Sequence, residues 1–151
     1  MRFQVGAVLR VPLLSAEPAF GLMLSVRPYM AFYVGDEAAY QAEMRTGFTV
    51  SPLFVVAVHN SAYSSGQWGN VLYRVVPKML PEIPVFFRQN IMNAADCEIV
   101  DSGGGVRKAS PDECISLERS AVWSAEHVEA RLRDHFAGRP NAFVESMKVK
   151  F

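Results

Sequence analysis

The chain has 151 residues and half of them are apolar, so it can bury a core of its own without disulfides or metal ions. Its 15 basic and 15 acidic residues cancel, which excludes a global charge that would draw it onto nucleic acid or an anionic membrane. Its two cysteines are too few for the disulfide framework of a small secreted domain. We therefore expect a single cytoplasmic domain over residues 1–151, in which residues 139–151 form a C-terminal extension.

The N-terminal third predicts strands. Arg10 and Pro12 interrupt the first apolar stretch, which argues against a signal peptide, and the longest apolar runs are far shorter than the ~18 residues of a membrane span. In Val5–Leu14 and Phe20–Val34, β-branched and aromatic residues alternate with small or polar ones. We expect two or three antiparallel strands here and no contact with a membrane.

Three patterns follow one another in the middle of the chain. Gly35–Gly47 is rich in helix formers and predicts a short helix or an excursion loop. Pro52–His59 is a continuous apolar run of strand length, which predicts a central strand covered on both faces. Asn60–Asn70 is polar and predicts a loop that carries two aromatic residues, Tyr63 and Trp68.

The next segment continues the β pattern. Val71–Val76 is strand-like, and the three prolines of Pro77–Pro84 predict a rigid connector, because proline fits neither a helix nor an interior strand. Phe86–Asn90 and Cys97–Ser110 predict further short strands, with a glycine-rich turn at Asp101–Gly105.

Helix signals are concentrated near the end of the chain. Ser110 and Glu113 form a capping-box pattern that predicts a helix over about Pro111–Arg119. Ser124 is a second N-cap, and the apolar residues of Ala125–Ala137 follow helical spacing until a glycine ends the pattern. The whole chain therefore predicts an α+β fold: a twisted antiparallel sheet, with a partial SH3-like barrel as one form of it, and two C-terminal helices packed on the sheet.

The residues give little sign of catalysis. Cys114 and His127 are the residue types of a thiol nucleophile and its base. Cys114 lies in a predicted amphipathic helix, where a free cysteine usually packs as a small apolar residue, and His127 lies in the first turn of another. We expect no catalytic residue, and we keep a small Cys/His hydrolase as the least favoured alternative.

Metal and cofactor sites are also not indicated. The three histidines, at positions 59, 127 and 135, lack the spacing of a metal site. The glycines of Asp101–Gly105 lack the Lys-Ser/Thr continuation of a phosphate loop, which favours a simple turn. We expect no metal and no cofactor.

One stretch is acidic although the chain as a whole is neutral. Asp96–Glu129 contains eight acidic residues against three basic ones, a net charge of −5. Such a stretch usually forms a solvated face, with acids near helix N-termini. The alternative is an acidic patch that meets a basic partner.

Two sets of residues form one pattern along the chain. In the C-terminal segment Leu117–Gly138 they are Leu117, Glu118, Ala121, Val122, Trp123, His127, Val128, Glu129, Arg131 and Leu132. Upstream they are Gly6, Val8, Pro12, Leu13, Gly21, Phe32, Tyr33 and Trp68. The C-terminal set resembles the signature of the immunity-26 family of bacterial polymorphic-toxin immunity proteins, and the upstream set follows the order of that family. The chain departs from the family pattern at Ala7, where an acidic residue is usual, and at Asn90, where an aspartate is frequent.

The resemblance implies a non-catalytic cytoplasmic protein that binds and neutralises a cognate toxin domain. It also implies that Leu117, Val122, Trp123, Val128 and Leu132 are core residues. Because discrimination between toxins belongs on variable loops, we look for the interface outside that core. The candidate partner-binding residues are Asp36, Glu37, Tyr40, Glu43, Tyr63, Trp68, Glu113 and Glu126. For Trp68 the resemblance equally implies a packing role.

The acidic stretch suggests what the partner would look like. A toxin that acts on nucleic acid has a cationic active site, which an acidic patch with Glu113 and Glu126 would complement. This hypothesis involves no direct contact of the chain with nucleic acid. A regulatory or scaffold module with a different protein partner would have the same sequence features and stays an alternative.

Overall fold

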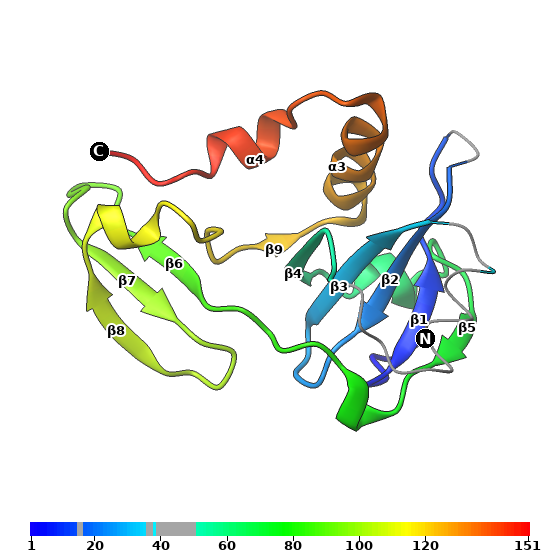
Figure 1. The fold of residues 1–151 in the computed structure, drawn as a ribbon. Helices are drawn as coiled ribbons and strands as arrows, with labels where there is room; N and C mark the ends of the chain where they lie inside the picture. The colour runs from blue at the N-terminus through cyan, green and yellow to red at the C-terminus, as the bar shows by residue number, and fades with distance from the viewer. Residues whose placement is uncertain (15–16, 36–37, 39–50) are drawn as a thin grey trace.

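Six strands form the larger of two sheets, in the order β5-β1-β2-β3-β4-β9 (Figure 1). Neighbouring strands are antiparallel except β4 and β9, which are parallel. The strands are β1 (Ala7–Arg10), β2 (Ala19–Met23), β3 (Tyr29–Val34), β4 (Phe54–Val58), β5 (Val71–Arg74) and β9 (Val122–Trp123). The structure is a computed structural model that describes residues 1–14, 17–35, 38 and 51–151.

Both faces of this sheet are covered. Apolar side chains point alternately to the two faces, and those on each face belong to a separate core. β4 is buried at all five positions, which confirms the strand predicted in Pro52–His59 and its cover on both faces. Its predicted central place is not confirmed, because β4 lies next to the edge strand β9. The first core contains Leu9, Met23, Met30, Phe32, Phe54 and Val56 from the sheet and Val128 and Leu132 from the C-terminal helix. The second contains Val8, Phe20, Leu22, Tyr33 and Val55, covered by Val75, Met79, Leu80 and Ile83.

Gly6 allows β1 and the segment after β5 to come together. Its φ of 87° lies in the left-handed region, and its carbonyl accepts the Val75 N–H at 2.8 Å. A Cβ at this position would overlap the Val75 carbonyl oxygen. The start of the sheet therefore requires glycine at position 6.

Helices cover the first core. α3 (Ala125–Ala137) has the predicted bounds: the Ser124 side chain accepts the His127 N–H, and Gly138 ends the helix at a φ of 67°. Ala125, Val128 and Leu132 form its buried face. The other helical segments are α2 (Ser61–Ser64), α4 (Ala142–Ser146) and the 3₁₀ turns η1 (Pro77–Met79) and η2 (Pro111–Cys114).

The smaller sheet has three antiparallel strands, β6 (Phe86–Gln89), β7 (Cys97–Val100) and β8 (Val106–Ala109). The predicted turn at Asp101–Gly105 joins β7 to β8, and the Asp101 carboxylate accepts the N–H groups of both Gly103 and Gly105 at 2.8 Å. One face of this sheet has a core of its own, formed by Phe87, Cys97 and Ile99 with Cys114. On the other face Phe86 and Val100 are also buried, and Phe86 stacks on Tyr29 of the larger sheet.

The helix predicted over Pro111–Arg119 is wrong beyond its first turn. The capping box of Ser110 and Glu113 forms, but the helical turn ends at Cys114. The chain then becomes extended, because Phe87 of β6 donates its N–H to the Glu118 carbonyl oxygen and accepts from the Ser120 N–H. Backbone pairing with a strand that is distant in sequence prevails over a locally signalled helix.

The fold is α+β with a twisted sheet, as predicted. The larger sheet is open, and β5 and β9 are its edges. The two C-terminal helices are α3 and α4, and α4 lies in the segment that was expected to be an extension. The predicted helix or loop over Gly35–Gly47 lies outside the described residues, apart from Gly35 and position 38. None of the described helices is long and apolar enough to cross a membrane.

Candidate functional site

The segment between η2 and β9 links the two sheets. Beside β6 it accepts the Phe87 N–H at the Glu118 carbonyl oxygen, at 3.1 Å, and Ser120 donates back to Phe87 at 2.8 Å. A few residues later the chain forms β9, which pairs with β4 of the larger sheet. Figure 1 shows this crossing from the small sheet to the large one. Side chains of this segment therefore lie at the boundary between the sheets.

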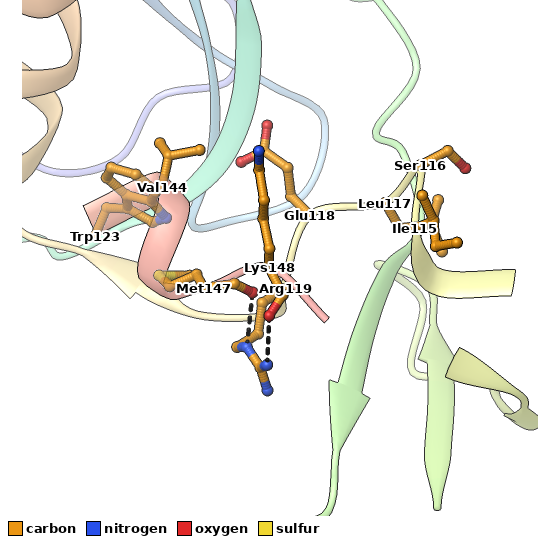
Figure 2. A pocket seen from close by; sticks show the side chains of 9 residues that line it. All are labelled: Ile115, Ser116, Leu117, Glu118, Arg119, Trp123, Val144, Met147 and Lys148. Carbon is orange, nitrogen blue, oxygen red and sulfur yellow. Dashed lines mark hydrogen bonds between the residues drawn. The ribbon is translucent and has the colours of Figure 1, made fainter. Parts of the chain in front are cut away.

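A cavity of about 200 Å³ lies along this segment. We call it the junction pocket. Figure 2 shows Trp123 and Val144 on one side of it, Ile115 and Leu117 on the other, and charged side chains between them. The lining residues are Ile115, Ser116, Leu117, Glu118, Arg119, Trp123, Val144, Met147 and Lys148.

An ion pair holds Glu118 in place. Arg131 of α3 donates from both terminal nitrogens to the two Glu118 carboxylate oxygens, at 2.8 and 3.0 Å. The Arg131 guanidinium lies over the ring of Phe54, at 3.8 Å from its centroid, and over Trp123 at 5.1 Å. The two-point ion pair and the stacking of the guanidinium on both rings restrict the positions of all four side chains. Glu118 is thus the internal partner of Arg131.

The C-terminal segment closes the junction pocket. Arg119 donates to the Met147 carbonyl oxygen at 3.0 Å and to the Lys148 carbonyl oxygen at 3.3 Å (Figure 2). The Gln89 side chain of β6 binds the backbone of Lys150 in both directions, at 2.7 and 2.9 Å. The residues expected to form an extension therefore line the site and join it to the small sheet.

Sequence reasoning missed this contribution, although a local signal for α4 exists. Asn141 is an N-cap whose side chain accepts the Val144 N–H at 3.0 Å. Phe143, Val144 and Met147 follow at helical spacing and pack against the first core. The signal is short, because α4 has only five residues.

Two of the predicted partner-binding residues are corrected by their burial. Tyr63 and Trp68 are 2% and 1% exposed, so neither can be a protruding aromatic anchor in a loop. Trp68 packs edge-on against Phe32 and donates its indole N–H to Glu129 at 3.2 Å. Tyr63 belongs to α2, a helical turn inside the predicted loop.

The remaining predicted residues are not brought together within the described part of the chain. Glu113 lies beside the small sheet and Glu126 lies in the first turn of α3, and both are exposed. The other four predicted residues are Asp36, Glu37, Tyr40 and Glu43, which lie outside the described residues.

The acids of Asp96–Glu129 serve local structure. The hydrogen bond from Lys108, at 2.9 Å, lowers the pKa of the Asp96 carboxyl. The Ser110 backbone N–H and the Arg107 guanidinium likewise lower the pKa of the Glu113 carboxyl. Three of the eight acids, including Glu118, pair with a basic side chain, which reduces the field that this stretch can project.

Cys114 and His127 pack in different clusters. Cys114 lies against Cys97 in the core of the small sheet and donates its thiol to the Ser110 carbonyl oxygen. Burial raises the pKa of this thiol, whereas a catalytic cysteine needs a lowered one. The His127 ring stacks on Phe143 with centroids 4.1 Å apart. The described residues contain no group of three potential metal ligands.

No protein family, no curated protein and no solved structure compared with this chain matches it. The function of the chain therefore rests on its own residues and geometry. The junction pocket combines apolar walls with charged side chains at the surface. Such a pocket can accept a side chain of another protein.

Proposed function

We propose that this chain is an immunity protein that binds and neutralises a cognate bacterial toxin domain without catalysis, and that the junction pocket is its main docking point. The observation that carries the proposal is the pocket itself, formed where the segment that resembles the immunity-26 family crosses between the sheets. Leu117, Glu118 and Trp123, which carry the resemblance, line it. Leu117, Glu118 and Trp123 form part of the pocket wall, and the other lining residues complete it.

The size of the pocket favours a protein side chain over a small molecule. Its volume of about 200 Å³ is below the range of about 300–1,000 Å³ that is usual for ligand sites. Interface hot spots often consist of one aromatic or long side chain in such a pocket. Ile115 is 63% exposed at the entrance, and an exposed isoleucine gains free energy when a partner covers it.

The charges favour a basic residue of the toxin. The Glu118 side chain is 37% exposed, so one edge of its ion pair with Arg131 is open to the solvent. Both cations that line the pocket are engaged elsewhere: the Arg119 guanidinium donates to backbone carbonyl groups, and Lys148 pairs with Glu145 at 3.0 Å. An arginine or lysine of the toxin would place its aliphatic part on Ile115 and Leu117 and its charge beside Glu118. A cationic toxin, such as one that acts on nucleic acid, fits this arrangement.

The test is calorimetric titration against the inactivated product of the adjacent gene. The proposal predicts a Kd in the nanomolar range or lower, about −12 kcal/mol. Ile115→Asp should weaken binding about 30-fold, the effect of removing a hot-spot side chain. Val76→Asp is the matched control, since Val76 is 48% exposed but does not line the pocket, and it should leave the affinity within about twofold.

Two results would overturn the proposal in different ways. No binding to the neighbouring gene product would remove the toxin as partner and favour a regulatory or scaffold module. Tight binding with equal effects of Ile115→Asp and Val76→Asp would keep the immunity function but move the interface away from the junction pocket.

A further inference from the structure

A second pocket, of about 540 Å³, lies beside the N-terminal segment. We call it the N-terminal pocket. It shares no lining residue with the junction pocket, and its volume is within the usual range for small-molecule sites. Its lining residues come from the segment before β1, from the turn between β2 and β3, and from α2 with its N-cap. They are Met1, Arg2, Phe3, Arg27, Asn60, Tyr63 and Ser64.

The charge of this pocket is positive. Two guanidinium groups, from Arg2 and Arg27, line it, and no acidic residue does. Both arginines are exposed, and neither forms an ion pair within the described part of the chain. In a chain with a net charge of zero, two unpaired guanidinium groups at one concavity form a local anion-attracting site.

Tyr63 also lines this pocket. Its side chain is 2% exposed, and its hydroxyl is buried and has no hydrogen-bond partner among the described residues. Buried hydroxyl groups are nearly always paired, so an unpaired one on a residue that lines a pocket points to an absent partner. Burial raises the pKa of this hydroxyl and the Arg27 charge opposes the rise, so Arg27 is within electrostatic reach of it.

Further donors and an apolar wall complete the N-terminal pocket. The Asn60 side chain lines the pocket, and its amide nitrogen is a hydrogen-bond donor. The Ser64 hydroxyl also lines the pocket. On the apolar side, Phe3 packs edge-on against Tyr63 with centroids 6.1 Å apart, beside Met1.

We propose that the N-terminal pocket binds a small phosphate monoester whose organic part is apolar or aromatic. Arg2 and Arg27 would bind the phosphate oxygens, with hydrogen bonds from Tyr63, Asn60 and Ser64, and the organic part would lie on Phe3 and Met1. A tetrahedral dianion with three free oxygens uses this many donors better than a planar carboxylate does. The inference does not depend on the toxin, because none of these residues belongs to the junction pocket.

The test is titration of the full chain with phenyl phosphate, inorganic phosphate and benzoate at low ionic strength, followed by calorimetry and by the rise in Tm. The proposal predicts saturable one-to-one binding, with phenyl phosphate tightest because it also uses the apolar wall. No saturation by either phosphate probe would overturn it. Tighter binding of short single-stranded DNA, with an affinity proportional to strand length, would replace it with a nucleic-acid surface.

Three variants and one control locate the binding. Arg2→Ala and Arg27→Ala should each weaken phenyl phosphate binding about tenfold, the effect of one charge-assisted contact. Arg88→Ala, at an exposed arginine of the small sheet, is the matched control and should change nothing. Equal effects of all three arginine variants would show non-specific attraction and overturn the site.

The Tyr63→Phe variant tests the unpaired hydroxyl. It removes only an oxygen that has no partner, so the Tm without ligand should stay the same or rise. Phenyl phosphate binding should weaken about tenfold or more, the usual effect of losing one hydrogen bond to a charged group. An unchanged affinity would overturn the assignment of this hydroxyl to the site.

Discussion

The two sheets differ in how they are buried. The larger sheet has a core on each face, with β2 and β4 buried at every position. The smaller sheet has a single core cluster of its own, with four buried members, and β8 is exposed along most of its length. The two sheets should therefore contribute unequally to stability, since burial of apolar area is the main favourable term.

The smaller sheet is held against the larger one by a few contacts. Phe86 stacks on Tyr29 with ring centroids 5.6 Å apart, and Phe87 bonds to the linking segment. The Gln89 side chain binds Lys150 of the C-terminal segment. The junction pocket lies at this boundary, so its shape depends on these contacts remaining intact.

The largest expected effect is on the larger sheet. Trp123→Ala should lower the free energy of unfolding by about 3–5 kcal/mol, because Trp123 is 1% exposed and contacts Phe54, Phe143 and Arg131. Urea denaturation measures this change. The neighbouring Val122 is 60% exposed, and Val122→Ala should change stability by less than about 0.5 kcal/mol. Similar losses in both variants would contradict the burial described for β9.

A smaller effect, confined to one region, is expected in the smaller sheet. Phe87→Ala should cost about 3 kcal/mol, because Phe87 is fully buried in its core and Arg119 lies over the ring. Hydrogen exchange should quicken in β6, β7 and β8 and stay slow in β2 and β4. Uniform loss of protection would show that the sheets unfold as one unit.

The same variant should change the reactivity of Cys114. In the wild type, burial keeps the thiol protonated and covered, so alkylation at neutral pH should be slow. Opening of the small sheet in Phe87→Ala should accelerate it. Fast alkylation of the wild-type protein would instead support the Cys/His hydrolase alternative.

An intermediate effect is expected at the boundary between the sheets. Arg131→Met should lower stability by about 2 kcal/mol, because it leaves Glu118 without its two charge-assisted hydrogen bonds. Arg133 on the same helix makes no ion pair among the described residues, so Arg133→Met should have little effect. Additive effects of Arg131→Met and Glu118→Gln would contradict the pairing.

The smallest effect concerns pH. The folded-state pKa of Glu113 is lowered by the Ser110 backbone N–H and by Arg107, so its contribution is present above the unfolded pKa of about 4.5 and is lost as pH falls through the lower folded value. Wild type and Glu113→Gln should therefore differ in Tm near neutral pH and converge in acid. A constant Tm difference at all pH values would contradict the capping role.

Elements with local causes could be predicted and those with distant causes could not. The strands of the N-terminal third and the turn at Asp101–Gly105 follow from alternation and glycine content, and their places were predicted. The burial of Trp68 was one of two readings that the resemblance left open, whereas the burial of Tyr63 was not predicted, because it depends on α2 and α3 lying over the same core. The polar residues around them indicated a loop, but a polar pattern does not show which side chains of the loop are buried.

The candidate site was the least predictable part. No acidic residue from the predicted set lines the junction pocket, although Leu117, Glu118 and Trp123 from the resemblance do. Met147 and Lys148 join them because Met147 packs against the first core and Arg119 binds the carbonyl groups of both residues. The hydrogen bonds of Arg119 join residues far apart in the chain, and such contacts leave no periodic pattern.

The bounds of α3 follow from the local sequence, because the interactions that start and end this helix span only a few residues. The Ser124 cap binds the His127 N–H, and Gly138 accepts a φ that other residues avoid. The path of residues 115–123, in contrast, depends on tertiary contacts. Their backbone N–H and C=O groups need partners, and β6 and β4 supply them from distant positions in the chain.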